Sequence, residues 1–163
     1  MLSHRFRFYR FGLLVLAACL LGTAAPIWAS EHRAVHQVTV PDEDRYTPFA
    51  LTIRAGDTVR WINNDTDDHT VVSDDAFNTA DNKGVDHLLA GTDSNGGKPG
   101  TFRLRFEHPG TFVYYCRFHA RLDSSNQPTA PGPRDGIQNM NNQGGPNFGT
   151  PMMGVITVLP AND

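Results

Sequence analysis

Residues 101–119 read TFRLRFEHPGTFVYYCRFH, and this stretch carries the pattern that decides the fold. Over residues 102–107 apolar side chains alternate with charged ones, and a period of two residues predicts a half-buried β-strand. The His-Pro-Gly triplet at 108–110 supplies a turn. Residues 111–116 then alternate again, which predicts a second strand that ends at a loop.

The same alternation recurs along the rest of the chain. It predicts strands at 35–40, on either side of the Ala55-Gly56-Asp57 turn, from His69 to Val72, and from Gly154 to Leu159. One helical turn is predicted around Asp86–Ala90, inside an otherwise irregular polar segment at 74–100. Short strands bounded by turn signals, without strand–helix alternation, predict an all-β sandwich or barrel. The 163 residues allow one domain, or one domain with appendages.

A polar segment at 124–151 separates the last predicted strand from the others. It holds five Pro, five Gly and five Asn, with Arg134 and Asp135 as its charged residues. Such a composition cannot bury enough apolar surface to pack on its own. We therefore predict a long polar loop inserted before the last strand.

The first 29 residues have the layout of a secretory signal peptide. Three arginines and no acid lie in residues 1–10, and residues 11–25 are predominantly apolar. This run of roughly 15 residues is shorter than the about 20 that a membrane-spanning helix needs. Cleavage after Ala29 would leave an exported, periplasmic domain of residues 30–163 without a transmembrane span. The alternative is cleavage at a lipobox-like Leu-Ala-Ala-Cys sequence, which would anchor the chain to the cell envelope through Cys19.

Charge and cysteine content exclude several classes of protein. The whole chain has 14 basic and 17 acidic residues, and removal of the signal peptide leaves 11 and 17, a net charge of −6. This balance offers no basic surface for nucleic acid. Two cysteines cannot form a disulfide-rich scaffold or a four-cysteine metal site. Cleavage after Ala29 leaves Cys116 alone, and an unpaired cysteine in an oxidising compartment needs another explanation.

Four candidate metal ligands lie at the ends of predicted strands. Cys116 ends a strand and His119 follows three residues later, so a thiolate and an imidazole can point at one position across a turn. His69 follows an acidic loop, and Met152 opens the last strand. One thiolate, two imidazoles and a weak axial thioether describe a mononuclear copper site. Zinc accepts the same Cys and His ligands but gains little from a thioether.

Four segments in this order resemble the plastocyanin–azurin (cupredoxin) family of small blue copper proteins. They are FALTIRAGDTVRWINND at 49–65, DHTVVSDD at 68–75, HPGTFVYYCRFH at 108–119 and MMGVITV at 152–158. The resemblance spans residues 36–119 and 151–159, most of the mature chain. It implies a Greek-key β-sandwich with one type 1 copper ion, for which the metal ligands would be His69, Cys116, His119 and, in the axial position, Met152.

The sequence departs from the family pattern in three places. Family members usually keep a few residues between the second histidine and the methionine, whereas His119 and Met152 are 33 positions apart. Met140 lies in the intervening segment and is an alternative axial ligand. Thr70 stands where the family often has Asn, and Phe118 stands where it often has Pro. Both residues are candidate neighbours of the ligands.

The resemblance implies a carrier of single electrons and not an enzyme. Electron transfer would be outer-sphere, between Cu(II) and Cu(I), and His119 would be the ligand nearest to the surface and the point of electron exit. Copper delivery or storage is the alternative function. Nitrite reductase and multicopper oxidase domains need His-x-His clusters, and the sequence contains none. The insert at 124–151 begins soon after His119, so we expect it to shape partner choice.

Five aspartates flank His69, at positions 65, 67, 68, 74 and 75. An acidic patch favours a cationic redox partner such as a c-type cytochrome, or an oxidoreductase, and we expect a monomer. Cleavage after Ala29 would also expose a second candidate copper site, Ser30-Glu31-His32. A free amine, two backbone amides and a histidine in third position form a square-planar nitrogen site, a geometry that Cu(II) favours.

Overall fold

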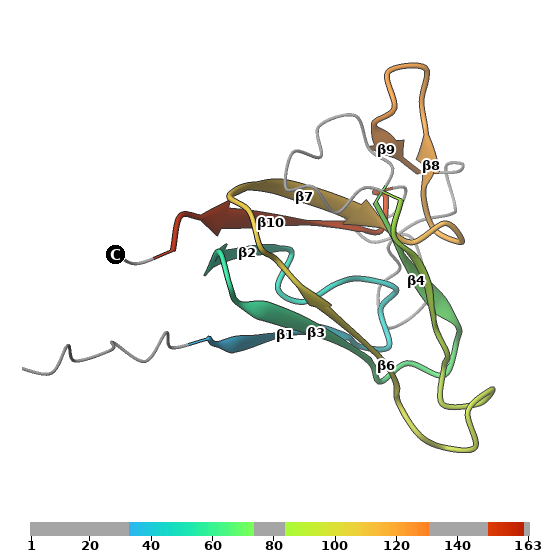
Figure 1. The fold of residues 1–163 in the computed structure, drawn as a ribbon. Coiled ribbons are helices and arrows are strands. Elements are labelled where there is room, and N and C mark those ends of the chain that lie inside the picture. The colour runs from blue at the N-terminus through green and yellow to red at the C-terminus, as the bar shows by residue number, and fades with distance from the viewer. Residues whose placement is uncertain (1–32, 74–83, 131–149, 162–163) are drawn as a thin grey trace, which may run out of the picture. The chain divides into compact units, whose positions relative to one another are not determined.

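The computed structural model describes residues 33–73, 84–130 and 150–161, and these ranges form strands without a helix (Figure 1). The strands are β1 (Val35–Val40), β2 (Ala50–Arg54), β3 (Thr58–Asn63), β4 (His69–Val72), β5 (Asp86–Leu89), β6 (Gly100–Arg105), β7 (Gly110–Tyr115), β8 (Arg121–Leu122), β9 (Pro128–Thr129) and β10 (Met153–Leu159). Nothing in the described ranges is a helix of the length and apolar character that a bilayer crossing requires. The predicted signal peptide lies outside these ranges.

Hydrogen bonds join the strands into two main sheets, of order β1-β3-β6 and β2-β10-β7-β4-β5, and pair β8 with β9 in a separate ribbon. Figure 1 shows β2, β7 and β10 in one layer and β1 and β3 in the other. The amide of Gly100 donates to the carbonyl of Ala90 (3.0 Å), so the start of β6 lies beside the end of β5 and the two sheets meet at this edge. The predicted all-β sandwich is confirmed.

Strand β10 lies between β2 and β7 in the larger sheet and sets the position of one end of this sheet. It runs parallel to β2 and antiparallel to β7, and its first residue, Met153, pairs with the last residue of β7, Tyr115. Strand β4 pairs with β7 at the same Tyr115. Because β4 begins at His69, Cys116 directly follows β7 and Met152 directly precedes β10, these three residues gather at one end of the sheet.

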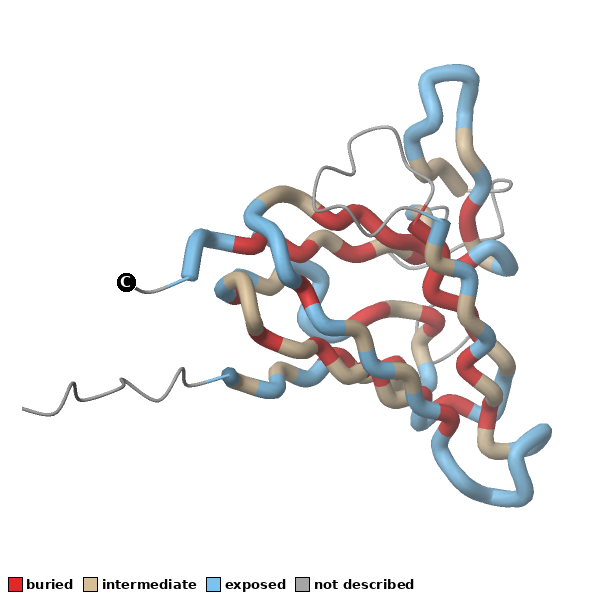
Figure 2. Tube along the Cα trace, in the orientation of Figure 1, coloured by how far each residue is buried: buried red, intermediate tan, exposed pale blue. Residues whose placement is uncertain are grey.

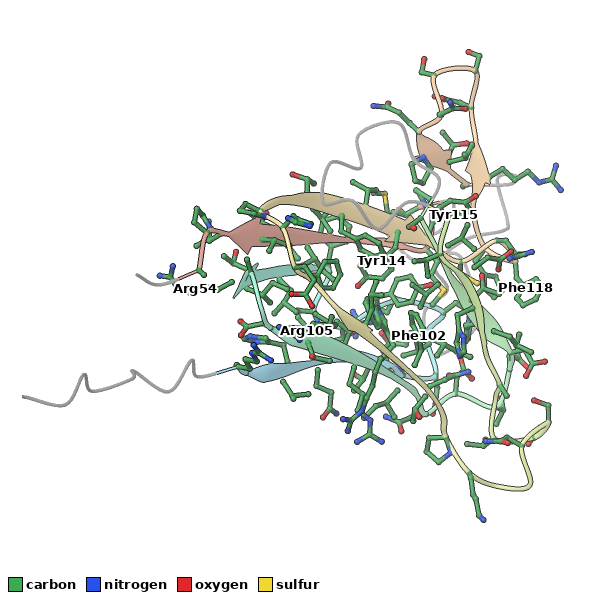
Figure 3. All side chains as sticks on the ribbon, viewed as in Figure 1. Arg54, Phe102, Arg105, Tyr114, Tyr115 and Phe118 are labelled. Carbon is green, nitrogen blue, oxygen red and sulfur yellow. The ribbon has the colours of Figure 1, made fainter. Side chains whose placement is uncertain are left out.

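The core lies between the two sheets and follows the predicted alternation. Figure 2 shows buried stretches on the facing strands of both layers, and Figure 3 shows Tyr114 among the side chains between them. The indole of Trp61 is fully buried, stacks on Phe102 with ring centroids 5.5 Å apart, and meets the edge of Tyr114 at 5.4 Å. Burial of such large aromatic rings is a main source of stability in a sandwich of this size.

The predicted helical turn at Asp86–Ala90 is wrong. Residues Asp86–Leu89 form β5, which pairs antiparallel with β4 so that His69 lies opposite Leu89. Leu89 is fully buried while Leu88 is exposed, which is the alternation of a strand and not of a helix. Pairing with β4 therefore overrides the weak local preference of a four-residue segment.

The polar segment predicted as a loop at 124–151 contains a short strand at its start. Pro128–Thr129 form β9 and pair with β8, which directly follows the turn that ends at Ala120. The carboxylate of Asp123 accepts hydrogen bonds from the amides of Ser125 (2.7 Å) and Gln127 (3.0 Å), which closes the hairpin between the two strands. Residues 131–149 of the predicted insert lie outside the described ranges.

We predict that Gly154→Ala destabilises the protein by about 1–3 kcal/mol, because a methyl group there overpacks the core. A Cβ at Gly154 would lie 2.4 Å from Cζ and from the hydroxyl oxygen of the fully buried Tyr114. Urea denaturation of the metal-free protein measures the change. The control is Thr157→Ala, an exposed position on the same strand, for which we expect about 0.5 kcal/mol or less. Equal stabilities for the two variants would contradict the packing account.

Candidate metal centre

The loop after β7 brings Cys116 and His119 together. The amide of His119 donates to the carbonyl of Cys116 (3.1 Å), which closes a turn over the intervening residues. This turn places Nδ1 of His119 3.7 Å from the Cys116 sulfur. Cys116 is fully buried, whereas the side chain of His119 keeps 18% of its surface exposed. The sulfur is therefore shielded from solvent, and one imidazole reaches the surface.

His69 completes the group from the start of β4. Its ring is fully buried, and its Nδ1 also lies 3.7 Å from the sulfur of Cys116. One donor atom from each of the three residues lies within 4.8 Å of the others. The sequence pattern predicts that these three side chains lie close together, and the structure brings them together around the sulfur of Cys116.

Two backbone hydrogen bonds tie Met152 to the same loop. The amide of Cys116 donates to the carbonyl of Met152 (2.9 Å), and the amide of Met152 donates to the carbonyl of His119 (3.1 Å). Met152 is fully buried and belongs to the same apolar core as Cys116. The alternative axial ligand, Met140, lies outside the described residues.

The distances around Cys116 fit one metal ion shared with both histidines. For bond lengths of about 2.3 Å to sulfur and about 2.0 Å to nitrogen, a trigonal angle of about 120° separates the two donors by about 3.7 Å. Both sulfur–nitrogen separations have this value. A thiolate, two imidazoles and a nearby thioether form the donor set of a type 1 copper site, and the group of His69, Cys116, His119 and Met152 suits it.

The three ionisable donors shift one another's pKa values. Burial alone would raise the pKa of the Cys116 thiol, but hydrogen bonds with His119 and His69 lower it to about 6. Burial would lower the pKa of His69, but Cys116 and Asp65 raise it overall. Burial also opposes the charged form of His119, yet Cys116 and Asp44 raise its pKa. The thiolate and the two imidazoles therefore stabilise one another's charged forms.

Thr70 connects the two segments that supply the donors. Its hydroxyl lies 3.8 Å from the Cys116 sulfur, toward which it donates, and it accepts a hydrogen bond from the amide of Arg117 (3.0 Å). The carbonyl of Thr70 in turn accepts a hydrogen bond from the buried hydroxyl of Tyr46. The second sequence candidate, Phe118, points outward with 49% of its surface exposed, and Figure 3 shows it at the end of the molecule.

Two carboxylates lie beside the histidines, and the sequence alone did not identify them as neighbours of the ligands. Asp65 lies 3.1 Å from Nε2 of His69, and Asp44 lies 3.6 Å from the same atom and 3.8 Å from Nε2 of His119. Asp65 belongs to the acidic loop that precedes His69, so its proximity in sequence was a usable signal. Asp44 lies between β1 and β2, far from the ligands in sequence, and no motif marks it.

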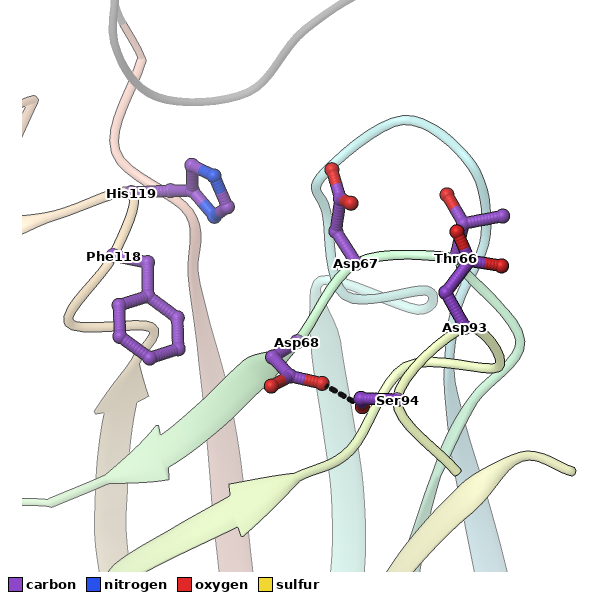
Figure 4. Close-up of a pocket in the computed structure, with 7 residues that line it drawn as sticks. All are labelled: Thr66, Asp67, Asp68, Asp93, Ser94, Phe118 and His119. Atoms are coloured by element: carbon purple, nitrogen blue, oxygen red, sulfur yellow. Dashed lines mark hydrogen bonds between the residues drawn. The ribbon is translucent and has the colours of Figure 1, made fainter. Parts of the chain in front are cut away.

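An open pocket of about 400 Å³ borders the exposed edge of His119. Figure 4 shows His119 and Phe118 on one wall and Asp67 and Asp68 facing them. Thr66, Asp93 and Ser94 complete the lining. Hydrogen bonds from Ser94 and from the Gly91 amide lower the pKa of Asp68, so its carboxylate carries a negative charge at neutral pH.

The family model of the cupredoxin-like domain matches residues 11–124, which include His69, Cys116 and His119 and stop before Met152. The chain therefore belongs to the cupredoxin-like family, whose members are generally copper proteins that transfer electrons. Among curated proteins, plastocyanin of Nostoc punctiforme is 29% identical over 117 residues, which cover 68% of this chain and 84% of that protein.

Solved structures with a similar fold include two cupredoxins. The reduced state of an amicyanin variant has a TM-score of 0.46 and 19% identity, covering 77% of this chain and 82% of that one. A purple cupredoxin from Nitrosopumilus maritimus has a TM-score of 0.46 and 21% identity, covering 76% of this chain and 99% of that one. The candidate N-terminal site Ser30-Glu31-His32, like Cys19, lies outside the described residues.

We predict that Cys116 of the metal-free protein titrates near pH 6 and not near its ordinary value of 9.0. The thiolate is the form that both histidines stabilise, so it is present above this pH and is lost as the pH falls through it. Ultraviolet absorbance of the thiolate, followed against pH, measures the titration. His119→Ala removes one hydrogen bond and should raise the pKa, whereas His108→Ala, at an exposed turn, should leave it unchanged. A thiol that titrates at its ordinary pKa in the unaltered protein would contradict this account.

Proposed function

We propose that the protein is an exported carrier of single electrons that binds one type 1 copper ion through His69, Cys116, His119 and Met152. The observation that carries this proposal is the convergence of one buried sulfur and two Nδ1 atoms at 3.7 Å, beside a buried methionine. Bound copper would supply the one-electron couple between Cu(II) and Cu(I). The protein would act as a carrier and not as an enzyme.

The surroundings of the donors support this role because they hold each donor in place. The loop 116–119 is closed by its own turn and fixed to Met152 by two backbone hydrogen bonds. Thr70 joins the Arg117 amide to the His69 segment. A site held by so many contacts changes little between oxidation states, which favours rapid electron transfer. The buried sulfur is protected from solvent, and the exposed edge of His119 offers the route to a partner.

The charge around His119 supports a positively charged redox partner, such as a c-type cytochrome, which would dock on a monomer of this protein. Three carboxylates line the pocket beside this imidazole, and the adjacent Phe118 provides an exposed apolar contact. Negative potential at the exit point of the electron speeds association with a cationic protein. The insert at 124–151 begins near the same end of the molecule and would modify this docking surface.

The sequence supports export of a domain of residues 30–163 after removal of a signal peptide of residues 1–29. The periplasm is the proposed location, with a lipid anchor on Cys19 as the alternative. Copper delivery or storage is the alternative function. Buried, constrained ligands favour electron transfer over delivery, because delivery requires the ion to leave the site readily.

We predict that the copper-loaded protein exchanges electrons with a basic c-type cytochrome at a rate that falls with added salt. Neutralising the acidic wall by Asp67→Asn, Asp68→Asn and Asp93→Asn together should slow the reaction about tenfold at low salt. Stopped-flow absorbance gives the rates. The control is Glu107→Gln in the β6–β7 turn, at the opposite end of the sheet from the site. Electron-transfer rates that change neither with added salt nor with the triple substitution would refute the docking proposal.

We predict that Met152→Leu alters the visible spectrum and the reduction potential of the copper-loaded protein, because it removes the thioether while keeping an apolar side chain of similar volume. Met140→Leu is the matched control and should change neither property. The opposite result, with Met140→Leu altering the spectrum and Met152→Leu silent, would transfer the axial role to Met140.

A further inference from the structure

Two buried carboxylates approach the histidines at the ring nitrogens that face away from the sulfur. Asp65 Oδ2 lies 3.1 Å from Nε2 of His69. Asp44 Oδ1 lies 3.6 Å from the same Nε2 and 3.8 Å from Nε2 of His119. The two rings have centroids 5.1 Å apart, so one carboxylate of Asp44 reaches both. Each imidazole therefore has its Nδ1 near the sulfur and its Nε2 near an acid.

The loop between β3 and β4 holds the carboxylate of Asp65 in a fixed orientation. Its Oδ1 accepts hydrogen bonds from the amides of Thr66 (2.6 Å) and Asp67 (3.4 Å), which leaves Oδ2 directed at His69. Asn63 fixes the same loop, since its side chain accepts from the Asp65 amide (3.0 Å) and donates to the carbonyls of Asp67 (2.8 Å) and Leu89 (2.9 Å). The carboxylate is thus in place before any metal binds.

Asp44 is buried between β1 and β2, with 7% of its surface exposed. Its backbone has a φ of 50°, in the left-handed region that Asp and Asn adopt more readily than most residues. The neighbouring Arg45 pairs with Glu43 at 2.5 Å, so its guanidinium serves a different carboxylate. A buried carboxylate needs compensating partners. The Nε2 atoms of His69 and His119, at 3.6 and 3.8 Å, lie within ion-pair distance of this carboxylate.

We propose that Asp65 and Asp44 are positioning residues of the metal centre. Asp65 accepts a hydrogen bond from Nε2 of His69, which holds the proton on this nitrogen and keeps Nδ1 directed at the metal, and the carboxylate of Asp44 places its charge beside the Nε2 atoms of both imidazoles. Their negative charge also stabilises the oxidised state of the centre and lowers its reduction potential. The second statement rests on the proposed function, because it requires a redox-active copper ion. The first concerns the imidazoles themselves and applies to any metal bound at Nδ1.

General chemistry supports both effects. A carboxylate that accepts a hydrogen bond from the far nitrogen of a histidine ligand fixes the tautomer and the ring orientation, and it makes the ligand more basic. The Cu(II) state carries one more positive charge than the Cu(I) state, so a nearby anion stabilises it more. Burial strengthens the effect because solvent and salt screen a buried pair poorly.

The first test measures the reduction potential of the copper-loaded protein and of Asp44→Asn and Asp65→Asn. Asparagine keeps the shape, tolerates the backbone of residue 44 and can still cap the loop at residue 65. For each variant we expect the equilibrium constant for reduction to rise about tenfold, which corresponds to about 59 mV for a one-electron couple. The control Asp42→Asn removes an equal charge from an exposed position in the same loop as Asp44, and should change the constant less than about twofold.

The second test uses Zn²⁺ as a diamagnetic probe that accepts Cys and His ligands. Proton–nitrogen NMR of the Zn²⁺-loaded protein gives the rate at which the Nε2 proton of His69 exchanges with solvent. In Asp65→Asn the side-chain oxygen stays on the loop amides and its NH₂ group faces this proton, so exchange should accelerate about tenfold or more. Asp42→Asn should match the unaltered protein.

The two tests separate the two claims. Absence of an intense visible band from the copper-loaded, unaltered protein would defeat the proposed function, while the Zn²⁺ measurement would still decide the role of Asp65 as a positioning residue. A normal band with unchanged potentials in both variants would overturn the electrostatic claim. Unchanged exchange of the His69 proton in Asp65→Asn would overturn the positioning claim.

Discussion

Two backbone hydrogen bonds between the loop 116–119 and Met152 hold together the end of the molecule on which the function depends. The bond between Cys116 and Met152 continues the antiparallel ladder of β7 and β10 beyond the last paired strand residues, Tyr115 and Met153, and the bond between Met152 and His119 ties the ligand loop to the same strand. Because β10 is also paired with β2, the position of the methionine is set by the whole larger sheet. A segment as distant in sequence as the C-terminal strand can therefore supply a residue to a site built around Cys116.

The site combines buried donors with a partly exposed edge. Cys116 and Met152 are sealed within the apolar core, and His69 is fully buried beneath the loops. His119 alone of the three histidine and cysteine donors reaches the surface, where carboxylates and an exposed phenylalanine surround it. The fold thus excludes solvent from the sulfur and leaves one imidazole edge of the site open to the surface.

Much of this arrangement could be predicted from the sequence, because it depends on local patterns. Alternating apolar residues identified the strands, and the three-residue spacing of Cys116 and His119 implied a turn that brings them close. The sequence could not predict Asp44, because its approach to the histidines depends on how the β1–β2 loop folds across the sheets. It also misassigned Asp86–Leu89, whose strand conformation comes from pairing with β4. Long-range pairing and loop packing leave no periodic signal in the chain.

The visible spectrum after addition of one equivalent of Cu²⁺ to the reduced, metal-free protein tests the central claim most directly. A thiolate bound to Cu(II) in a trigonal site should give an intense band near ~600 nm that disappears on reduction. Cys116→Ser should lack the band, because it removes the sulfur while keeping a side chain of similar size. A protein that binds Cu²⁺ without this band, with Cys116 present and reduced, would contradict the assignment of a type 1 copper centre.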